Sequence, residues 1–560
     1  MAGINQERNL NHSRRRTITT WLFLGVIIVF VIVVRVRLLD VPLERDEGEY
    51  AYMGQLLLQG IPPYSEAYNM KFPGSYLMYA AVMSLFGQTT QGIHLGFMLL
   101  NCATILLVFY LSREVVREPG AIAASATYAV LSLSSSVLGF AAHATHFVIL
   151  PALGGVLLLL RALKKEKWHL YFFSGVLLGI SFLMKQTGIF FFLFSALYII
   201  YHHVSSRSAG SPARKSASLT ACKPAGLQAP FLKLSTLSFG AALPLIIVAV
   251  WLYVAGVFDT FWFWTIEYAS KYASQIPFSQ APIFFRESFT SVADGFFIVW
   301  LLAALGLVSA FLHKELKVSR AFIFFFAAFS FLSICPGFYF RQHYYVTLLP
   351  AVSMLVGIFV DYSDMKITAS FKAPYLRFAG LVIFIVAILT GIVSQKEYLF
   401  QDGPNKVSRT FYGPNPFPEA VEIAKFLKSA SSVSDKIAIL GSEPEIFFYS
   451  QRHSATGYIY VYGLMEIHQY SLKMQKEMIN EIESSRPKFI VVVQVDTSWL
   501  IRKQSEKYIF NWLDNYIRGN YSLVGVADTV SKETTIYKWY ADAARYVIRS
   551  PYHTLVFERR

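Results

Sequence analysis

Long apolar stretches recur along the first 395 positions and are separated by short polar segments. The first covers residues 20–38, and a run of basic residues precedes it. A helix needs about 20 mainly apolar residues to cross a bilayer, and eleven stretches approach that length. The pattern therefore predicts an α-helical multi-span membrane domain over residues 1–395, with about eleven transmembrane helices. The later stretches begin near Gly92, Ala121, His146, His169, Gly188, Leu237, Gly295, Ala321, Tyr345 and Leu376.

The pattern changes after position 395, where apolar runs become shorter and charged residues more frequent. Strand-like runs alternate here with stretches of helical spacing. Residues 396–560 are therefore expected to form a small α/β domain outside the membrane. No glycine-rich phosphate loop occurs in it, so nothing indicates a nucleotide donor. We expect helices over residues 419–428, 464–484 and 506–518, and strands over 436–440, 488–493, 522–527 and 534–539.

The composition agrees with a membrane protein and explains the strong positive charge. Hydrophobic residues make up 55% of the chain and charged residues 15%, whereas soluble chains carry about 25% charged residues. The net charge of +15 does not indicate nucleic-acid binding, because the basic residues gather in alternate loops, as the positive-inside rule requires. The same bias places the N-terminus in the cytoplasm. After eleven spans of the inner (plasma) membrane, the C-terminal domain is then extracytoplasmic.

The first outside loop opens with a cluster of carboxylates, formed by Glu44, Asp46, Glu47 and Glu49. If a helix starts here, Asp46, Glu49 and Tyr50 share a face, because they lie three and four residues apart. Acidic residues also suit a helix N-terminus through the helix dipole alone. The other interpretation is functional, since a carboxylate held beside apolar surface at the membrane edge could act as a general base.

Two amphipathic helices are expected within this loop, which covers residues 40–91. The first, residues 51–59, ends at a Gly-Ile-Pro-Pro-Tyr segment, and the second covers residues 76–86. Amphipathic helices of this kind lie along the membrane interface. Together they would frame a site at the level of the lipid headgroups.

The ordered motifs of this loop resemble the first periplasmic loop of the GT-C glycosyltransferases. They are most similar to the branch of protein O-mannosyltransferases and lipid A aminoarabinose transferases, and the matching residues are 46–51, 60–64, 71–74 and 86–87. The resemblance implies a GT-C type membrane domain and a sugar donor linked to polyprenyl phosphate. It places the base that activates the acceptor hydroxyl at Asp46 and the carrier phosphate near Lys71. Glu47 would be the neighbour of the base or a metal contact.

Further candidates lie in later outside segments. The second outside loop lacks the carboxylate that the resembling family usually offers there. His143 and His146 stand in its place and could bind a metal, orient an acceptor, or merely cap spans at the interface. Lys185 could contact phosphate or extend its amine to the interface. Arg341 precedes an intramembrane proline, as in that family, and its planar fork of donors suits phosphate. His343 could assist Arg341 or bind a metal. A divalent cation is the one cofactor that these residues suggest.

The sequence thus predicts a membrane glycosyltransferase that moves a hexosyl or pentosyl group from a polyprenyl-phosphate donor to an acceptor hydroxyl, with inversion, on the extracytoplasmic face. A protein, lipid A or a glycan could be the acceptor. One alternative is a transporter or flippase of a lipid-linked or small anionic substrate. It would favour ionisable residues at the bilayer midplane, and the apolar stretches hold few. Another alternative, a non-catalytic scaffold that displays the α/β domain, would not need Asp46.

Overall fold

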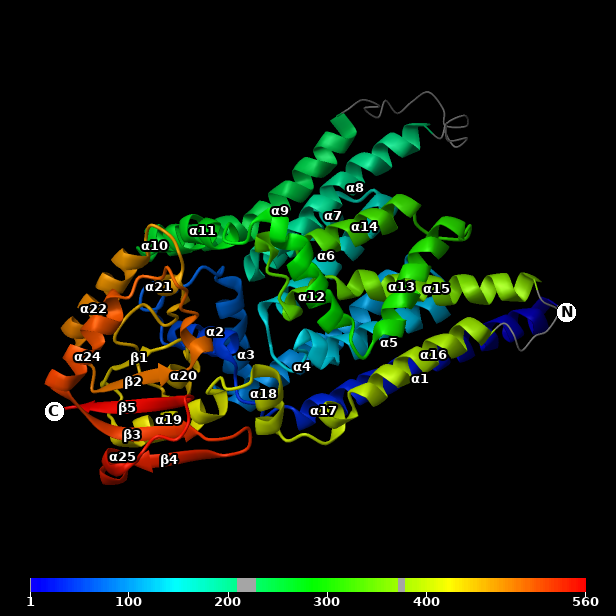
Figure 1. The fold of residues 1–560 in the computed structure, drawn as a ribbon. Helices are drawn as coiled ribbons and strands as arrows, with labels where there is room; N and C mark the ends of the chain where they lie inside the picture. The colour runs from blue at the N-terminus through cyan, green and yellow to red at the C-terminus, as the bar shows by residue number, and fades with distance from the viewer. Residues whose placement is uncertain (1, 209–227, 371–377) are drawn as a thin grey trace.

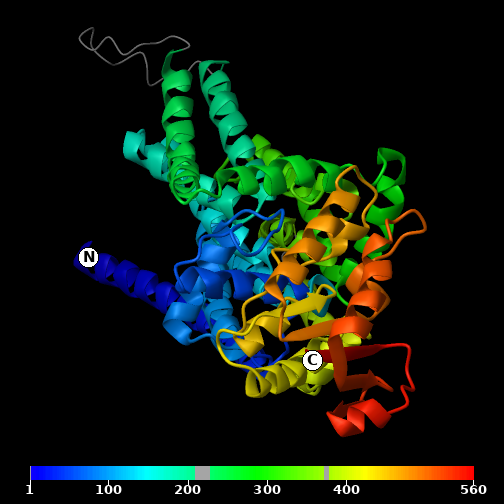
Figure 2. The ribbon, with the colours of Figure 1, turned by 90° about the vertical axis from the view of Figure 1, so that its left-hand side faces the viewer.

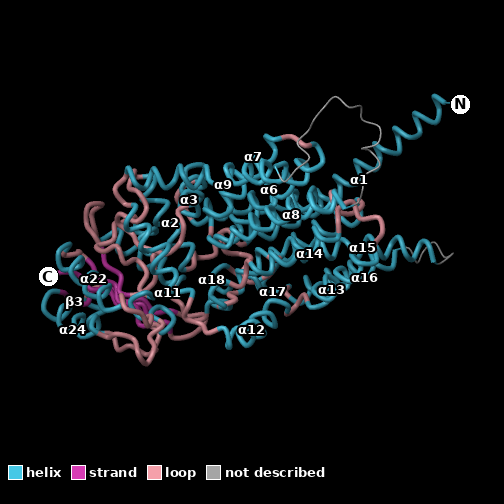
Figure 3. The backbone as a smooth tube through the Cα atoms, turned by 90° about the horizontal axis from the view of Figure 1, so that it is seen from above, coloured by secondary structure: helices cyan, strands magenta, loops and turns pink. Residues whose placement is uncertain are grey.

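The computed structural model describes residues 2–208, 228–370 and 378–560. A large helical body carries a smaller domain, built around a sheet, at one end (Figure 1). Among the described residues, the strands lie close to the C-terminus, as the tube view of Figure 3 shows. The N-terminus lies at the end of the molecule opposite to the sheet domain. This arrangement confirms the predicted class, a multi-helix body followed by a small α/β domain.

Each predicted apolar stretch falls on one helix of the body. By length and composition, five described helices can cross a membrane, or six if a pair bent by 111°, formed by Phe278–Ala293 and Phe297–Leu312, is one span. The count of eleven spans stays a prediction. The start predicted near Leu376 lies outside the described residues. The eleven helices are α1 (Ala2–Arg37), α4 (Thr90–Arg113), α5 (Glu118–Leu133), α6 (Ala144–Lys165), α7 (Trp168–Met184), α8 (Ile189–Ser208), α9 (Gln228–Val254), α13 (Phe297–Leu312), α14 (Arg320–Leu332), α15 (Leu349–Ser370) and α16 (Ala379–Ser394).

The surface and packing of these helices suit a lipid environment. On α1, Val26 and Val33 are 68% and 60% exposed, as expected for side chains that face acyl chains. Helices in membranes pack closely where small residues let the backbones approach. A Cβ atom added at Gly175 of α7 would lie 2.0 Å from the carbonyl oxygen of Leu237 on α9. The body is therefore a closely packed bundle with an apolar outer surface, and the protein is a multi-pass membrane protein.

The first outside loop forms two helices, α2 (Arg45–Leu58) and α3 (Gly74–Phe86). α2 starts earlier than the predicted residue 51, because Glu44 and Glu47 cap it reciprocally. Most of α2 is buried, so protein covers the greater part of its surface. It packs against α3 and against α20 (Glu445–Ser450) of the sheet domain, between the helical body and the sheet (Figure 1).

The sheet domain contains five strands in the order β1-β2-β5-β3-β4. β1 and β2 pair in parallel, and the other neighbours are antiparallel. The sequence pattern did not predict β5, and the predicted helix 464–484 is two helices. The strands are β1 (Ile437–Leu440), β2 (Phe489–Gln494), β3 (Tyr521–Thr529), β4 (Thr535–Trp539) and β5 (His553–Arg559); the helices around them are α17 (Lys396–Phe400), α18 (Pro404–Tyr412), α19 (Phe417–Ala430), α21 (Tyr462–Met465), α22 (Ser471–Ser485), α23 (Asp496–Trp499), α24 (Tyr508–Asn520) and α25 (Ala541–Arg545).

Shorter helical segments connect the long helices of the body and turn the chain at their ends. They are α10 (Phe258–Trp262), the π-helical segment Phe263–Tyr268, α11 (Ala269–Ala273), α12 (Ala281–Ala293) and the single turns Ser135–Val137, Gln186–Gly188, Phe278–Gln280, Pro336–Phe338 and Gln342–Thr347. Figure 2 views the molecule from the side of the sheet domain, with α1 extending behind it.

Buried polar contacts hold the sheet domain on α2. The guanidinium of Arg45 donates to Oε1 of Glu443 at 2.8 Å and to Oδ1 of Asn415 at 3.0 Å. The ring of Tyr52 stacks on that of Phe447, with 5.0 Å between centroids. A buried ion pair without good partners would be costly, but here the guanidinium has several acceptors. The N-terminal turn of α2 and the sheet domain therefore border the same region of the protein.

Candidate active site

The carboxylates in the first turn of α2 point in different directions. Glu44 is the N-cap, and its carboxylate accepts a hydrogen bond from the backbone N–H of Glu47 at 3.0 Å. In return, the Glu47 carboxylate accepts from the backbone N–H of Glu44 at 3.3 Å. This capping box fixes the start of the helix. Asp46 and Glu49, three residues apart, then lie on one face and both contact Lys71.

Glu47 connects α2 to two other segments. Its side chain is 1% exposed, and Oε1 lies 3.0 Å from Nε2 of His94 on α4. The same oxygen accepts a hydrogen bond from the backbone N–H of Ala142 at 2.6 Å. Ala142 directly precedes His143, so this contact fixes the segment that carries that imidazole. The geometry of Glu47 is that of a residue that positions its neighbours.

Lys71 lies between two carboxylates. Its Nζ atom is 2.8 Å from Oδ1 of Asp46 and 2.6 Å from Oε2 of Glu49. The other oxygen of Glu49 accepts a hydrogen bond from the hydroxyl of Tyr76 on α3, at 2.8 Å. Nζ also lies 4.6 Å from the ring centroid of Tyr50, so the resemblance-based candidates Asp46, Lys71 and Tyr50 do come together. Lys71 is charge-balanced by protein groups before any ligand arrives.

The two carboxylates differ in exposure, and their pKa values differ accordingly. The Asp46 side chain is 20% exposed, whereas that of Glu49 is fully buried. Burial acts to raise the pKa of Asp46, but Lys71 and His143 outweigh it and lower the value to about 2. Burial raises the pKa of Glu49 to about 7, although Lys71 opposes the shift. Asp46 is thus an ionised carboxylate that is partly exposed, whereas Glu49 is fully buried.

His143 and His343 place two imidazoles beside Asp46. Their rings stack with 4.1 Å between centroids and an interplanar angle of 15°. One ligand atom from each of these histidines and from Asp46 lies within 4.8 Å of the others. Burial lowers the pKa of His143 to about 4, although Asp46 opposes the shift, and burial also lowers the pKa of His343. Both rings are therefore neutral, and both nitrogens of His143 are buried without a hydrogen-bond partner.

His146 is not part of this group. His143 is the N-cap of α6, with extended backbone angles, so helical spacing does not place the two residues on one face. The ring of His146 packs edge-on against Phe97 of α4, with 4.6 Å between centroids. The structure therefore separates two histidines that the sequence analysis paired as possible metal or acceptor ligands.

Lys185 and Arg341 supply positive charge that no carboxylate balances. Nζ of Lys185 lies 3.9 Å from the ring centroid of Tyr344, and the guanidinium carbon of Arg341 lies 5.5 Å from that of Tyr339. Within the described residues, neither cation forms an ion pair. Burial lowers the pKa of Lys185 to about 7, although Asp46 opposes the shift. Cations without a carboxylate partner are the groups that commonly bind anions such as phosphate.

The sheet domain contributes aromatic residues that the sequence analysis missed. Nζ of Lys71 lies 5.6 Å from the ring centroid of Tyr460. Tyr462 interacts electrostatically with Arg341 and Asp46. The one signal in the sequence is the alternation of tyrosine with aliphatic residues over 458–462, and that pattern is typical of a strand. Their place beside the cluster depends on how the two domains pack.

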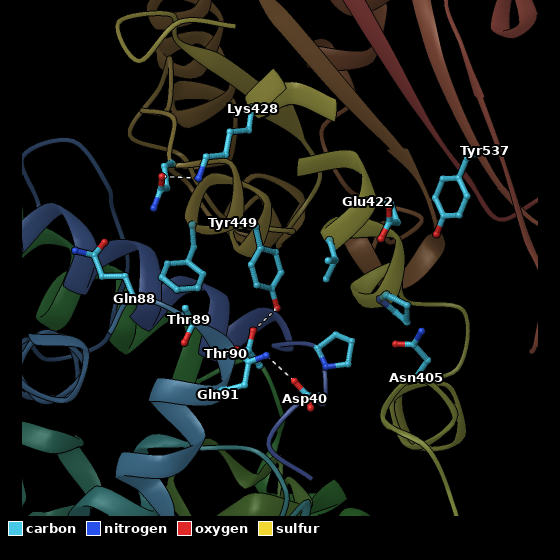
Figure 4. A pocket seen from close by; sticks show the side chains of 15 residues that line it. Asp40, Gln88, Thr89, Thr90, Gln91, Asn405, Glu422, Lys428, Tyr449 and Tyr537 are labelled. Carbon is cyan, nitrogen blue, oxygen red and sulfur yellow. Dashed lines mark hydrogen bonds between the residues drawn. The ribbon is translucent and has the colours of Figure 1, made fainter. Parts of the chain in front are cut away.

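A separate cavity of about 720 Å³ lies where the end of α1, the start of α4 and the sheet domain meet (Figure 4). Gln88, Thr90 and Tyr449 are among its lining residues. The hydroxyl of Thr90 donates to the hydroxyl oxygen of Tyr449 at 3.4 Å. None of the site residues predicted from the sequence lines this cavity. The cluster around Asp46 is therefore a different place in the structure.

Comparison of the sequence with known proteins gives one family. Residues 71–222 match the dolichyl-phosphate-mannose-protein mannosyltransferases. The match begins at Lys71, so the carboxylates of α2 lie just before it. No curated protein matches the chain in sequence.

Solved structures match nearly the whole chain. ArnT from Cupriavidus metallidurans bound to undecaprenyl phosphate has a TM-score of 0.59 at 13% identity, over 96% of this chain and 97% of that one. ArnT in the apo state has a TM-score of 0.55 at 14% identity, over 97% and 98%. The oligosaccharyltransferase AglB from Archaeoglobus fulgidus, in complex with an inhibitory peptide and a dolichol-phosphate, has a TM-score of 0.53 at 12% identity, over 94% and 75%. The chain therefore has the fold of the GT-C superfamily, close to the protein mannosyltransferases and ArnT, as the resemblance in its first outside loop implies.

Proposed function

We propose that the protein is a membrane glycosyltransferase that moves a sugar from a polyprenyl-phosphate donor to an acceptor hydroxyl on the extracytoplasmic face, with inversion. The observation that carries this proposal is the position of Asp46. Its accessible, ionised carboxylate interacts electrostatically with Lys185, which forms no ion pair within the described residues. A base for the acceptor and a cation for a leaving phosphate are thus neighbours. The fold supports the proposal, because the similar ArnT structure was solved with undecaprenyl phosphate.

Asp46 would act as the general base. The acceptor oxygen forms a bond to the anomeric carbon while its proton passes to the carboxylate of Asp46. A pKa near 2 makes Asp46 a weak base, so the proton moves late, when the bond to the sugar has already made the hydroxyl acidic. As Asp46 loses its charge, Glu49 still holds Lys71, because their ion pair is separate. The protein therefore keeps the geometry of the site during the proton transfer.

The leaving group would be stabilised by charge and not by protonation. The bond between the anomeric carbon and the phosphate oxygen breaks, and the electron pair stays on the phosphate. Lys185 and Arg341 are the cations free to neutralise that charge, whereas Lys71 is already engaged by Asp46 and Glu49. Preorganised charge of this kind is usually the largest single contribution to catalysis. The resemblance places the phosphate near Lys71, and the ion pairs of the site favour Lys185 and Arg341 as its direct contacts.

A divalent cation fits the residues Asp46, His143 and His343. Neither buried nitrogen of His143 has a hydrogen-bond partner, although Nδ1 lies 3.5 Å from Oε1 of Glu44, and both imidazoles are neutral, as metal ligands must be. One carboxylate and two imidazoles suit zinc-type coordination with an open position. When bound, such an ion would add positive charge next to the reacting groups. His343 would then be a metal ligand, in line with one of the two roles expected for it.

The test compares envelope glycans and lipid-linked sugars, by mass spectrometry, from cells with and without the gene. Cells that carry Asp46→Asn should lack the product, although the variant protein is expressed and inserted normally. Asp40→Asn is the matched control, because Asp40 lies in the same loop, is exposed, and bonds Gln91 away from the cluster. Full product formation by Asp46→Asn would overturn the assignment of the base. Unchanged glycans and lipid-linked sugars without the gene would overturn the proposed function.

A further inference from the structure

One segment of the sheet domain, residues 454–462, borders the candidate active site. It follows α20 and is joined to the first outside loop by backbone hydrogen bonds. The N–H of Tyr68 donates to the carbonyl of Gly457 at 2.7 Å, and the N–H of Ser454 donates to the hydroxyl of Tyr52 on α2 at 2.8 Å. This segment therefore has a fixed position relative to α2 and its carboxylates.

Glu481 of α22 holds the same segment from the other side. Its carboxylate accepts hydrogen bonds from the N–H of Gly457 at 2.9 Å and from the hydroxyl of Thr456. The hydroxyl of Tyr68 donates to it as well, at 3.3 Å. One carboxylate thus joins the segment, the first outside loop and the sheet domain. Such a network rigidifies the backbone at this point.

The rigid segment presents two tyrosine rings to the cluster. The rings of Tyr460 and Tyr462 meet at 86°, with 4.7 Å between their centroids, and so form a corner. Nζ of Lys71 lies 5.6 Å from the centroid of Tyr460, and the guanidinium carbon of Arg45 lies 5.3 Å from that of Tyr462. Tyr462 is fixed by a hydrogen bond from its hydroxyl to the carbonyl of Thr497. The protein therefore holds the ring of Tyr462 in this arrangement, and both rings are half-buried.

The side chains around Asp46 that come from the helical body differ in chemistry from those that come from the sheet domain. Lys185, whose amine lies over the ring of Tyr344, belongs to the helical body, whereas Arg341 also interacts electrostatically with Tyr460 and Tyr462 and so lies between the two sides. The sheet domain offers aromatic faces, and its nearest cation, Arg45 at the junction, is engaged by Glu443. In an inverting displacement the acceptor attacks from the side opposite to the leaving phosphate. The aromatic side is therefore the one that remains for the acceptor.

We propose that Tyr460 and Tyr462 form the acceptor subsite and that the acceptor is a saccharide, whose ring stacks on the tyrosine corner while one hydroxyl points at Asp46. This inference rests on the proposed function and adds the class of the acceptor. A sugar ring has an apolar face of C–H groups and a rim of hydroxyls, and tyrosine offers an apolar ring with a polar tip. The corner matches both parts of such a ligand.

The backbone of the segment argues against an extended polypeptide as acceptor. Peptides bind to such surfaces by pairing their backbone with free N–H and carbonyl groups. Here the N–H of Tyr458 donates to the hydroxyl of Thr456 at 3.1 Å, and the N–H of Val461 donates to the hydroxyl of Ser442 at 3.1 Å. Both polar groups of Gly457 are also engaged. The N–H groups of Gly457, Tyr458 and Val461 are therefore already engaged within the protein.

Site-specific photo-crosslinking tests this inference even while the identity of the acceptor is open. The photoreactive residue p-benzoylphenylalanine is placed at position 460 or 462 of the full-length protein in cells, and the adducts are analysed by mass spectrometry. Position 508 is the control, because Tyr508 belongs to the same domain and is 48% exposed. We expect adducts that release sugar fragments at 460 and 462 but not at 508. Adducts with peptides or phospholipids, or none above the level at 508, would overturn the proposal.

Two variants then separate this subsite from the donor site. Tyr460→Leu should lower product formation by about tenfold, the loss of one aromatic contact, whereas Tyr508→Leu, at an exposed position of the same domain, should keep it. Both variants should bind undecaprenyl phosphate in nanodiscs as the wild type does. A wild type that does not bind this lipid would contradict the proposed function itself. Equal product from Tyr460→Leu and the wild type, with lipid binding intact, would contradict only the acceptor subsite.

Discussion

Nζ of Lys71 lies 2.8 Å from Oδ1 of Asp46, in an ion pair whose two side chains are each 20% exposed. A second carboxylate, Glu49, lies 2.6 Å from the same nitrogen but is fully buried. One cation thus keeps the accessible carboxylate ionised, with its pKa lowered to about 2. The buried carboxylate has its pKa raised to about 7 by burial. This difference in environment is what assigns the two residues different roles.

Replacing Lys71 by methionine should abolish most of the transfer. Without the cation, Asp46 and Glu49 repel each other, so one of them takes up a proton and Asp46 loses its fixed orientation. We expect product formation to fall by about 100-fold or more, the usual contribution of a positioned base. Lys71→Arg keeps the charge and should retain part of the activity. The measurement is the amount of product per inserted protein, and wild-type turnover by Lys71→Met would contradict this role.

The affinity for the lipid phosphate should fall as the pH rises. Lys185 has a pKa lowered to about 7, so it is charged below that pH and neutral above it. Glu49 gains negative charge over the same range and acts in the same direction, whereas His143 and His343 stay neutral. Between about pH 6 and about pH 8, binding of undecaprenyl phosphate in nanodiscs should weaken by about tenfold, the loss of one charged contact.

Lys185→Arg provides the control for this pH dependence. Arginine stays protonated at every pH in that range, so binding by the variant should change much less with pH. The part that remains measures the contribution of Glu49 together with the second ionisation of the phosphate itself. If the variant shows the same slope as the wild type, Lys185 does not contact the phosphate.

Glu47→Gln should affect stability more than chemistry. Glu47 is buried, and its carboxylate contacts His94 and the N–H of Ala142. A glutamine keeps one acceptor but loses the charge, and we expect unfolding in detergent at a lower temperature, with a loss of about 1–3 kcal/mol. Product formation per folded molecule should stay within about threefold of the wild type. A loss as complete as that of Asp46→Asn, with unchanged stability, would instead make Glu47 a direct participant.

The sequence predicted where the apolar helices of the body lie, because lipid imposes a simple rule of length and polarity on each span. It also identified the carboxylates of the first loop, which are contiguous in the chain. It could not predict β5, since this strand gains its stability from pairing with β2 and β3, which precede it by many residues. Tyr460 and Tyr462 were missed for a similar reason. No local sequence pattern distinguishes them from strand residues. Their place beside the site depends on the packing of the sheet domain on α2.

The two histidines of the second outside loop show how local spacing can mislead. An i, i+3 spacing brings side chains together only when both residues are helical. His143 has the extended backbone of an N-cap, so its ring meets His343 and Asp46, while His146 meets Phe97. The partner of His143 lies 200 positions further along the chain, beyond the reach of any local pattern.

This separation of the histidines gives a test of metal binding. Purified wild-type protein, dialysed against zinc or manganese and washed, should retain about one ion per chain by elemental mass spectrometry. His143→Ala and His343→Ala should lose it. His146→Ala is the matched control and should keep it, because its ring packs against Phe97. Equal loss in all three variants, or no retained ion in the wild type, would contradict a site formed by Asp46, His143 and His343.

Gly48 lies where α2 meets the sheet domain. A Cβ atom added there would lie 2.6 Å from both the backbone nitrogen and Cβ of Glu445 at the start of α20. Alanine favours an isolated helix over glycine by about 1 kcal/mol, so a free α2 would be stabilised by the substitution. Because the contacted atoms are mostly backbone, they cannot yield cheaply, and Gly48→Ala should instead destabilise the protein by about 1–3 kcal/mol.

The same substitution should move the sheet domain relative to Asp46 and so lower transfer. Gly519→Ala is the control, since Gly519 is also in a helix, α24 of the same domain, and a Cβ there meets open space. Thermal unfolding and product formation should be close to wild type for Gly519→Ala, whereas both should fall for Gly48→Ala. If Gly48→Ala melts at or above the wild-type temperature with full activity, α20 does not pack on α2 in the working protein. The place of Tyr460 beside Lys71 would then depend on the hydrogen bonds of Ser454 and Gly457 to the first outside loop.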